Sequence, residues 1–244
     1  MGRALTLSAL ADLILGRCCC SCGDPGTILC RWCAEALAPW PAPVPGLPAV
    51  SAFDYEGVVR DVLIAFKEHG VRELARPLAM GLAQSITVTL QAHACHHTTA
   101  ITLVPVPARP GRDFDHSAHL ATLARDQLAR RDLQIDVFTV LTRQNHTEMK
   151  HLGRSQRKQA AQGSFTLKAT SRTLKALQRR LVIVTDDIIT SGATSTEAMR
   201  VLGASGLSPL GIAAAARTPP PRRQPGYVGL VPRSRSTQTP PSFS

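Results

Sequence analysis

Residues 182–194 read VIVTDDIITSGAT, and this stretch decides the fold that we expect. Its first part, residues 182–185, is apolar or β-branched and suits a buried strand. Two adjacent acids follow, Asp186 and Asp187, and then a short run of small and hydroxyl residues before a helical pattern. A buried strand that leads through such a run into a helix predicts one unit of a parallel sheet covered by helices.

The same alternation extends over residues 51–217. Apolar residues recur at helical spacing, which predicts helices at 58–66, 74–86, 118–131 and 196–207. Short apolar runs predict strands at 101–106, 135–141, 181–185 and 209–214. Pro77 is expected in the first turn of the second helix, where its missing N–H costs nothing. Alternation of this kind predicts an α/β fold with a parallel sheet.

The segment that follows the strand at 181–185 is the candidate ligand site. In parallel sheets, ligands bind at the carboxyl ends of strands. Small residues around Gly192 let backbone amides point at one phosphate, at the positive end of a helix dipole. Adjacent carboxylates accept hydrogen bonds from two vicinal sugar hydroxyls. Together they predict a ribose 5-phosphate site, and a Mg²⁺ site on the two acids is the alternative. The candidate residues are Asp186, Asp187, Ile188, Ile189, Thr190, Ser191, Gly192, Ala193 and Thr194.

A second motif lies near the N-terminus, where six of the seven cysteines fall within residues 18–33. Two C-x-x-C pairs at this separation predict one structural zinc ion with four thiolate ligands. The candidate ligands are Cys19, Cys22, Cys30 and Cys33, and Cys18 could replace Cys19. Disulfides are the alternative, but no convincing secretory signal precedes the cysteines, which favours a reducing, cytoplasmic location.

Composition divides the chain into three parts. Residues 39–48 hold five prolines and are expected to form an extended linker, with a boundary near residue 50. The predicted domains are 1–49 (an N-terminal helix over 4–15, the cysteine module and the linker), 50–216 (the α/β domain) and 217–244 (a disordered basic tail with five arginines and no acid). A net charge of +11 favours anionic partners, and no apolar run is long enough to span a membrane.

The pattern D-D-x-x-T-x-G-x-T over 186–194 resembles the phosphoribosyl diphosphate (PRPP) signature of type I phosphoribosyltransferases. Further motifs follow the double C-x-x-C in order: AFDYEGVVRDVLIAFKEHG at 52–70, VPVPARPGRDFDH at 104–116, Arg157, and GSF at 163–165. With them, the chain resembles the ComF family of competence-associated phosphoribosyltransferase-like proteins over about residues 15–216. The resemblance implies a type I phosphoribosyltransferase fold behind a zinc ribbon, PRPP with Mg²⁺ as ligand, and a role in DNA uptake or natural transformation.

If the chain is an enzyme, the implied chemistry is displacement of diphosphate at the anomeric carbon of PRPP by an acceptor that the sequence does not identify. Asp186 and Asp187 would hold the ribose. Arg109 and Arg112, which follow the strand at 101–106, are candidates to stabilise the leaving diphosphate. Lys67, at the end of a helix, is a further candidate, with a solvated helix end as the equal alternative.

Three positions depart from the family's usual pattern. Asp113, Met149 and Ala160 stand where members usually carry glycine, glutamine and asparagine. Two classes of function therefore stay open: a PRPP-dependent transferase, or a non-catalytic accessory protein that keeps the PRPP pocket and binds single-stranded DNA or proteins of the competence machinery. His116 and His119 are expected on the surface of a helix.

Overall fold

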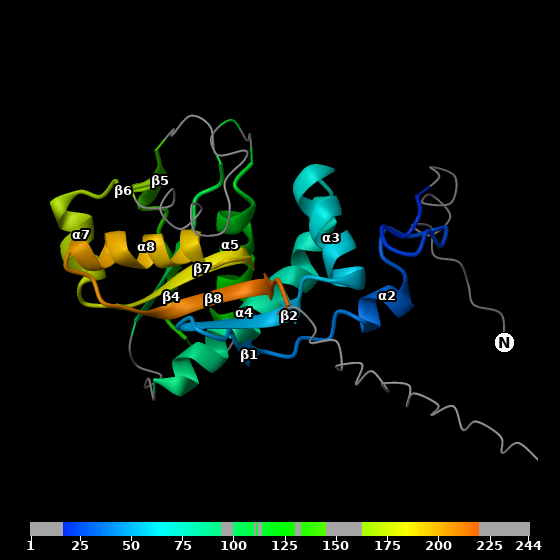
Figure 1. The fold of residues 1–244 in the computed structure, drawn as a ribbon, viewed down its shortest axis with the longest axis horizontal. Helices are drawn as coiled ribbons and strands as arrows, with labels where there is room; N and C mark the ends of the chain where they lie inside the picture. Colours follow the sequence, from blue (N-terminus) through cyan, green and yellow to red (C-terminus); the bar gives the residue numbers. More distant parts are fainter. Residues whose placement is uncertain are drawn as a thin grey trace, which may run out of the picture.

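The computed structural model describes residues 17–93, 100–109, 111, 114–129, 133–144 and 163–219. Its centre is a six-stranded sheet in the order β1-β2-β8-β7-β3-β4 (Figure 1). Neighbouring strands run parallel, except that β1 is antiparallel to β2. The predicted fold class, a parallel sheet flanked by helices, is confirmed.

The strands of the central sheet are β1 (Ala42–Pro43), β2 (Ala49–Asp54), β3 (Ile101–Pro105), β4 (Ile135–Val137), β7 (Leu181–Ile189) and β8 (Pro209–Arg217). A separate antiparallel pair consists of β5 (Leu141–Arg143) and β6 (Phe165–Leu167). The helices are α2 (Arg31–Glu35), α3 (Gly57–Glu68), α4 (Ala75–Ala92), α5 (His116–Ala129), α7 (Ser171–Leu177) and α8 (Ala193–Ala204), with a 3₁₀ turn, η1, at Arg72–Leu74.

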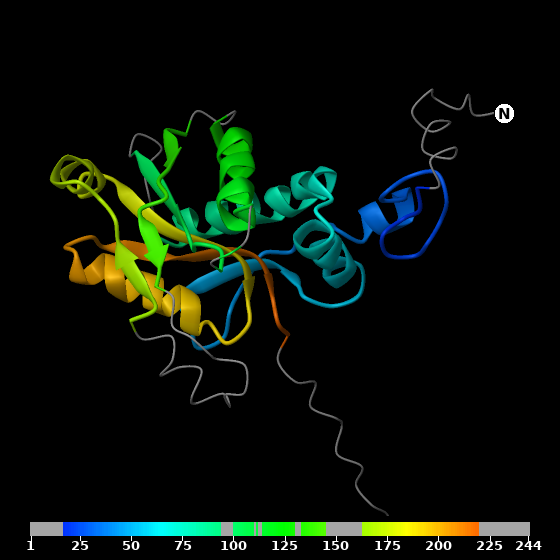
Figure 2. The same ribbon diagram turned by 90° about the horizontal axis from the view of Figure 1, so that it is seen from above.

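Helices cover the sheet on both faces. Seen from above, α4 and α5 lie on one side of the sheet and α8 on the other (Figure 2). Two buried apolar clusters fill these layers, one beneath α3, α4 and α5, the other beneath α7 and α8. Val182, Ile183 and Val184 of β7 are fully buried between them. Burial on both faces explains why this strand is a continuous apolar run instead of an alternating one.

Strand β7 is longer than the sequence predicted. It continues past residue 185 to Ile189, because Asp186 pairs with Ala214 and Ile188 pairs with Ala216 of β8. Helix α8 begins at Ala193, before the predicted start at 196. The two acids therefore lie within the last part of the strand, and the connection to the helix is shorter than expected.

The prediction of one strand over 135–141 is wrong. Residues 135–137 form β4 beside β3, and the chain then leaves the central sheet after Phe138, whose N–H donates to the Leu103 carbonyl at 2.9 Å. Leu141–Arg143 pairs with β6 instead. The run alternates buried and exposed residues in both strands, and it contains no glycine or proline, so no change in the residue pattern marks the break between them.

The proline-rich segment adds an edge strand to the sheet, and the cysteine module lies at one end of the molecule (Figure 1). Residues 42–43 of that segment form β1 at the sheet edge, a position where proline is tolerated because no ladder N–H is needed. The cysteine module, with α2, lies at the end of the molecule near α3 and far from α7 (Figures 1 and 2). Within the described residues, no helix is long and apolar enough to cross a membrane. The predicted helix at 4–15 and the tail beyond 219 lie outside the described residues.

Candidate functional site

A cavity of about 350 Å³ opens at the carboxyl ends of β3 and β7. From β3 the chain crosses through α5 to β4, and from β7 it crosses through α8 to β8, on the opposite side. Adjacent strands whose connections diverge in this way leave a crevice, which is where open α/β sheets bind ligands. The lining residues are Lys67, Glu68, Val106, Pro107, Ala108, Arg109, His116, Ser117, Arg143, Asp186, Asp187, Ile188, Ile189, Thr190, Gly192, Thr194 and Ser195.

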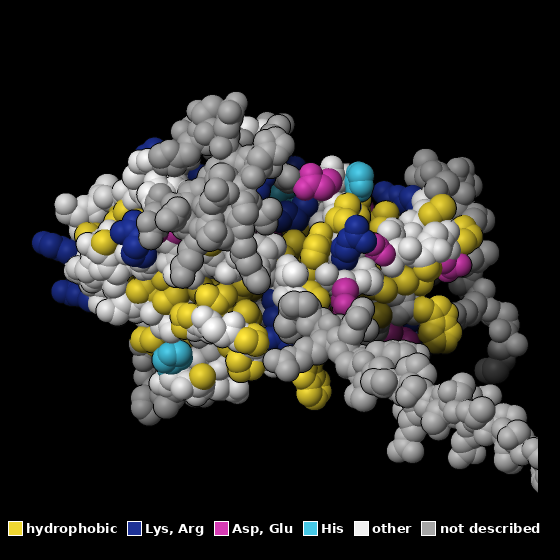
Figure 3. All heavy atoms as spheres, in the orientation of Figure 1, with side chains coloured by type: hydrophobic (Ala, Val, Ile, Leu, Met, Phe, Trp, Pro, Cys, Tyr) yellow, Lys and Arg dark blue, Asp and Glu magenta, His cyan; other side chains and the backbone are white. Residues whose placement is uncertain are grey.

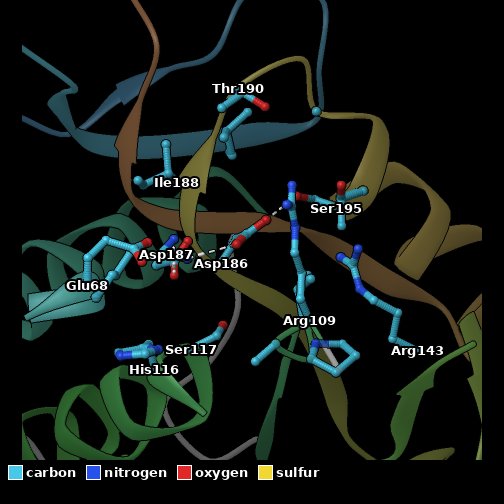
Figure 4. Close-up of a pocket in the computed structure, with 17 residues that line it drawn as sticks. Glu68, Arg109, His116, Ser117, Arg143, Asp186, Asp187, Ile188, Thr190 and Ser195 are labelled. Atoms are coloured by element: carbon cyan, nitrogen blue, oxygen red, sulfur yellow. Dashed lines mark hydrogen bonds and ion pairs between the residues drawn. The ribbon is translucent and has the colours of Figure 1, made fainter. Parts of the chain in front are cut away.

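Asp186 is the buried acid of this cavity, with 9% of the residue exposed. The Ser195 hydroxyl donates to its Oδ2 at 2.7 Å, and the Asp187 N–H donates to its Oδ1 at 2.9 Å (Figure 4). Burial, and then the neighbouring Asp187 charge, raise the pKa of Asp186 from 3.8 to about 7. Sequence reasoning missed Ser195. Ser195 lies in the first turn of α8, directly after the D-D-x-x-T-x-G-x-T pattern. A hydroxyl residue at that place in the sequence could have indicated a partner for Asp186.

Asp187 faces a cation from another part of the chain. Its Oδ2 lies 2.8 Å from Lys67 Nζ at the end of α3, and the two side chains are only 13% and 24% exposed. Consecutive residues of a strand point to opposite sides, so Asp186 and Asp187 reach different partners. Lys67 is thus a partner of an acid in the cavity, and the solvated helix end considered from the sequence is not what the structure shows.

The conformation of the turn between β7 and α8 depends on Gly192. This residue is the N-cap of α8 and has a φ of 72°, in the left-handed region that favours glycine. Thr190, Gly192 and Thr194 line the cavity at the positive end of the α8 dipole. A side chain at position 192 would collide with the Leu47 side chain. Ser191 and Ala193 belong to the same turn, where the Ala193 N–H donates to Ser191 Oγ at 3.4 Å.

Two guanidinium groups line the cavity beside Ser195 and Asp186. Arg109 follows β3 and Arg143 ends β5, and Figure 4 shows the Arg109 side chain extending toward Asp186 and Ser195. Burial, and then the Arg109 charge, lower the pKa of Arg143, while the Asp186 charge opposes them. Arg143 Nε is buried and has no hydrogen-bond partner among the described residues. Sequence reasoning missed Arg143, and Arg112 lies outside the described residues.

His116 is also part of the lining, and its prediction as a surface residue is wrong. It is 7% exposed, with ring centroids 5.0 Å from Phe66 and 4.9 Å from Phe114. The next residue, Ser117, reaches the β7 edge through a 3.4 Å hydrogen bond to the Thr185 carbonyl. The missed signal was helical phase, because position 116 lies four residues before the buried Leu120.

The cysteine module brings the four candidate zinc ligands together. The sulfur atoms of Cys19, Cys22, Cys30 and Cys33 all lie within 4.8 Å of one another. A tetrahedral zinc site with Zn–S bonds of about 2.3 Å has S···S edges of about 3.8 Å, so the four sulfurs fit one zinc ion after small adjustments. Cys18 is exposed and outside the cluster, whereas Cys19 is buried in it.

Backbone donors favour the thiolate form of Cys19, whereas burial raises the pKa of Cys33 to about 12. The Cys30 N–H donates to Cys19 Sγ at 3.4 Å. Burial by itself raises the pKa of Cys19, but N–H groups that include those of Cys22 and Cys30 outweigh it and lower the pKa from 9.0 to about 6. The thiolate is the form that binds zinc, and four thiolates leave no open coordination position. The arrangement fits a structural zinc ribbon.

No family model matches the sequence, and no curated protein matches it. Among solved structures, the chain is similar to the hypoxanthine-guanine phosphoribosyl transferase of L. donovani, with a TM-score of 0.37 and 16% identity over 62% of this chain and 74% of that one. It is also similar to a structure described as the allosteric regulatory enzyme of purine biosynthesis, with a TM-score of 0.32 and 12% identity. That match covers 59% of this chain and 26% of the other. Similarities of this size carry no argument about activity.

Proposed function

We propose that this chain is a PRPP-binding, phosphoribosyltransferase-like protein of the ComF family, cytoplasmic, with an acceptor still to be identified. One observation carries the proposal. A single cavity combines two adjacent carboxylates, the N-terminus of a helix and two guanidinium groups without an acid bonded to them among the described residues. These are complementary to a diol, a phosphate and a second anionic group, which PRPP carries on one ribose.

Each part of PRPP is matched by residues of the cavity. The ribose hydroxyls donate to Asp186 and Asp187, the 5-phosphate lies at the turn of Thr190 and Gly192, and the diphosphate faces Arg109. Mg²⁺ would be bound largely through diphosphate and ribose oxygens of the substrate and would offset the charge of the leaving group. The Mg²⁺-site alternative for the two acids is less well supported, because Lys67 already provides Asp187 with a cation at 2.8 Å.

The proposed reaction is substitution at the anomeric carbon. A bond forms between the acceptor nucleophile and this carbon, and the bond to diphosphate breaks with its electron pair leaving on the diphosphate oxygen. The ribose carries positive charge as the bond breaks. The carboxylates of Asp186 and Asp187 lie beside that charge, and Arg109 stabilises the opposite charge on the leaving group.

Calorimetry with PRPP, with and without Mg²⁺, tests the binding proposal. Asp187→Asn keeps the size of the side chain but replaces an acceptor-only group, and we expect it to weaken PRPP binding by about 1–3 kcal/mol. Asp126→Asn, at an exposed acid of α5, is the matched control and should bind as wild type does. No binding to wild type at millimolar PRPP would reject the proposal. Diphosphate release with a panel of candidate acceptors would then separate a transferase from a non-catalytic binder.

A second candidate function, binding of single-stranded DNA as an accessory protein in DNA uptake, is favoured by a basic surface at α7. Residues 168–180 contain five cations and no acid. Four of them are exposed: Lys168, Arg172, Lys175 and Arg179. Arg172 and Lys175 lie in α7, and the other two lie just before and just after it. Dark-blue side chains project from this end of the molecule in Figure 3. The fifth cation, Arg180, pairs with Asp136. A group of exposed cations attracts a phosphate backbone whatever its sequence.

Fluorescence anisotropy with single-stranded DNA at several salt concentrations tests this second candidate. The double variant Lys175→Ala, Arg179→Ala should lower the affinity and reduce the salt slope by about 0.7 for each phosphate that the variant no longer neutralises. Arg31→Ala, an exposed arginine on α2 at the other end of the molecule, is the control. Equal slopes in all three proteins would exclude the α7 surface as the DNA-binding surface.

A further inference from the structure

Helix α3 contacts both the cysteine module and the cavity. Near its N-terminal end, Val58 packs against the buried cysteines Cys19, Cys30 and Cys33. One turn later, Asp61 Oδ2 accepts a hydrogen bond from the Ser21 hydroxyl at 2.8 Å, and Ser21 lies between two of the candidate zinc ligands. The module therefore supplies part of the surface that holds this helix.

The other end of α3 reaches the ligand site. Lys67 Nζ lies 2.8 Å from Asp187 Oδ2, and both side chains are largely shielded from water. Asp61 and Lys67 are six positions apart on one continuous helix, a distance of about 9 Å along its axis. Because a helix of this length moves as a rigid body, a displacement of α3 at Asp61 also displaces Lys67.

The packing of α3 is shared between the module and the main core. Val62, Leu63 and Phe66 are fully buried in the cluster beneath α3, α4 and α5. Cys20, Ile28 and Leu29 of the module pack against the same cluster. Figure 2 shows α3 beside the module's α2 on one side and α4 on the other. Unfolding of the module would therefore open one side of the core that positions α3.

We propose that the cysteine module positions Lys67 through α3, so that zinc binding at the module and ligand binding at Asp187 are coupled. The inference rests on the proposed function and adds its regulation. Zinc supplies the folding free energy of a small four-cysteine module, so removing the metal removes the support that the module gives to Val58 and Asp61. Lys67 then no longer holds the Asp187 carboxylate in its position in the cavity or offsets its negative charge. The charges of Asp187 and Asp186 then repel each other, and the acceptors for the ribose hydroxyls are no longer fixed. Zinc therefore raises the affinity for PRPP, and PRPP raises the affinity for zinc by the same factor.

Two measurements on the full chain test the coupling. Calorimetry with PRPP and Mg²⁺ compares zinc-loaded protein with protein stripped by a zinc-selective chelator, and we expect a loss of affinity between about 5-fold and 150-fold. Competition with a chromogenic zinc chelator, with and without PRPP, should show the same factor in zinc affinity. No PRPP binding by the zinc-loaded protein would overturn the proposed function and this inference together. Equal PRPP binding with and without zinc would overturn this inference alone.

Two variants keep the test decisive if the stripped protein does not stay folded. Ser21→Ala removes the hydrogen bond to Asp61 but no cysteine, and it should weaken PRPP binding several-fold while zinc stays bound. Arg31→Gln changes an exposed residue of the same module that pairs with Glu35, and it should bind PRPP as wild type does. Lys67→Gln removes the ammonium group that pairs with Asp187, so PRPP should not change the zinc affinity of this variant. A zinc affinity that still responds to PRPP in Lys67→Gln, or unchanged PRPP binding in Ser21→Ala, would contradict the route through α3.

Discussion

Asp186→Asn should change how the stability of the protein depends on pH. In the wild type, burial and Asp187 raise the pKa of this carboxyl from 3.8 to about 7. A raised pKa in the folded state stabilises the fold fully below the unfolded pKa, and that stabilisation is lost as the pH rises through the folded pKa. The stability of the wild type should therefore fall between about pH 4 and pH 7 because of this residue. Asparagine carries no titrating proton, so the variant should lack this loss.

The magnitude follows from the two pKa values. One pKa unit corresponds to about 1.4 kcal/mol, so the rise from 3.8 to about 7 corresponds to on the order of 4 kcal/mol. Only the part above pH 5 falls within a practical assay, which leaves about 3 kcal/mol between pH 5 and pH 8. Asparagine can keep both contacts of the carboxyl, because its oxygen accepts from the Asp187 N–H and its amide donates to the Ser195 hydroxyl. The comparison is therefore close to a test of ionisation alone.

Urea unfolding at pH 5, 6, 7 and 8, with zinc held constant, provides the assay. We expect the free energy of unfolding of Asp186→Asn, relative to wild type, to rise by about 3 kcal/mol from pH 5 to pH 8. Effects of pH on zinc binding are common to both proteins and cancel in the difference. Asp126→Asn controls for the loss of an acid at an exposed site. Parallel profiles for wild type and Asp186→Asn would refute the reasoning, because they would mean that Asp186 is ionised in the folded protein throughout this range.

Three further predictions concern other parts of the chain. Cys30→Ser should release zinc and destabilise the cysteine module, and elemental analysis that finds no zinc in the wild type would contradict the zinc site. Gly192→Val should weaken PRPP binding more than Asp187→Asn does, and it should also lower the melting temperature. The reason is that valine at this position combines an unfavourable φ of 72° with a collision at Leu47. If calorimetry and thermal unfolding give the wild-type values, the turn at Gly192 is not the phosphate-binding turn. A chain ending at Pro219 keeps Arg217, which belongs to β8 and pairs with Asp54, and lacks the four arginines that follow in the sequence. It should bind single-stranded DNA with a smaller salt slope, which anisotropy measures, and an identical slope would exclude the tail as a DNA-binding segment.

Local patterns in the sequence were enough to predict much of the site's framework. The run from Val182 to Thr194 predicted a buried strand, two acids and a turn into a helix, because strand burial and helix starts depend on residues that are close in the chain. The paired C-x-x-C motifs predicted the cluster for the same reason, since each pair fixes two ligands within a few residues. Apolar spacing also predicted the helices α3, α4, α5 and α8 and the strands β3, β7 and β8, but it missed β2, β6 and α7.

Only the tertiary structure decided which residues complete the site. Lys67 and Arg143 are far from Asp186 in the sequence, and the folding of α3 and β5 toward the end of β7 brings them to it. Burial, which depends on every neighbouring element, raises the pKa of Asp186 and places His116 in the cavity lining. The choice of Cys19 over Cys18 also needed the folded chain, because zinc ligand pairs occur at both C-x₂-C and C-x₃-C spacing, and only the Cys19 sulfur belongs to the cluster. Spacing along the chain determines local structure, whereas burial and contacts between distant segments depend on how the whole chain packs.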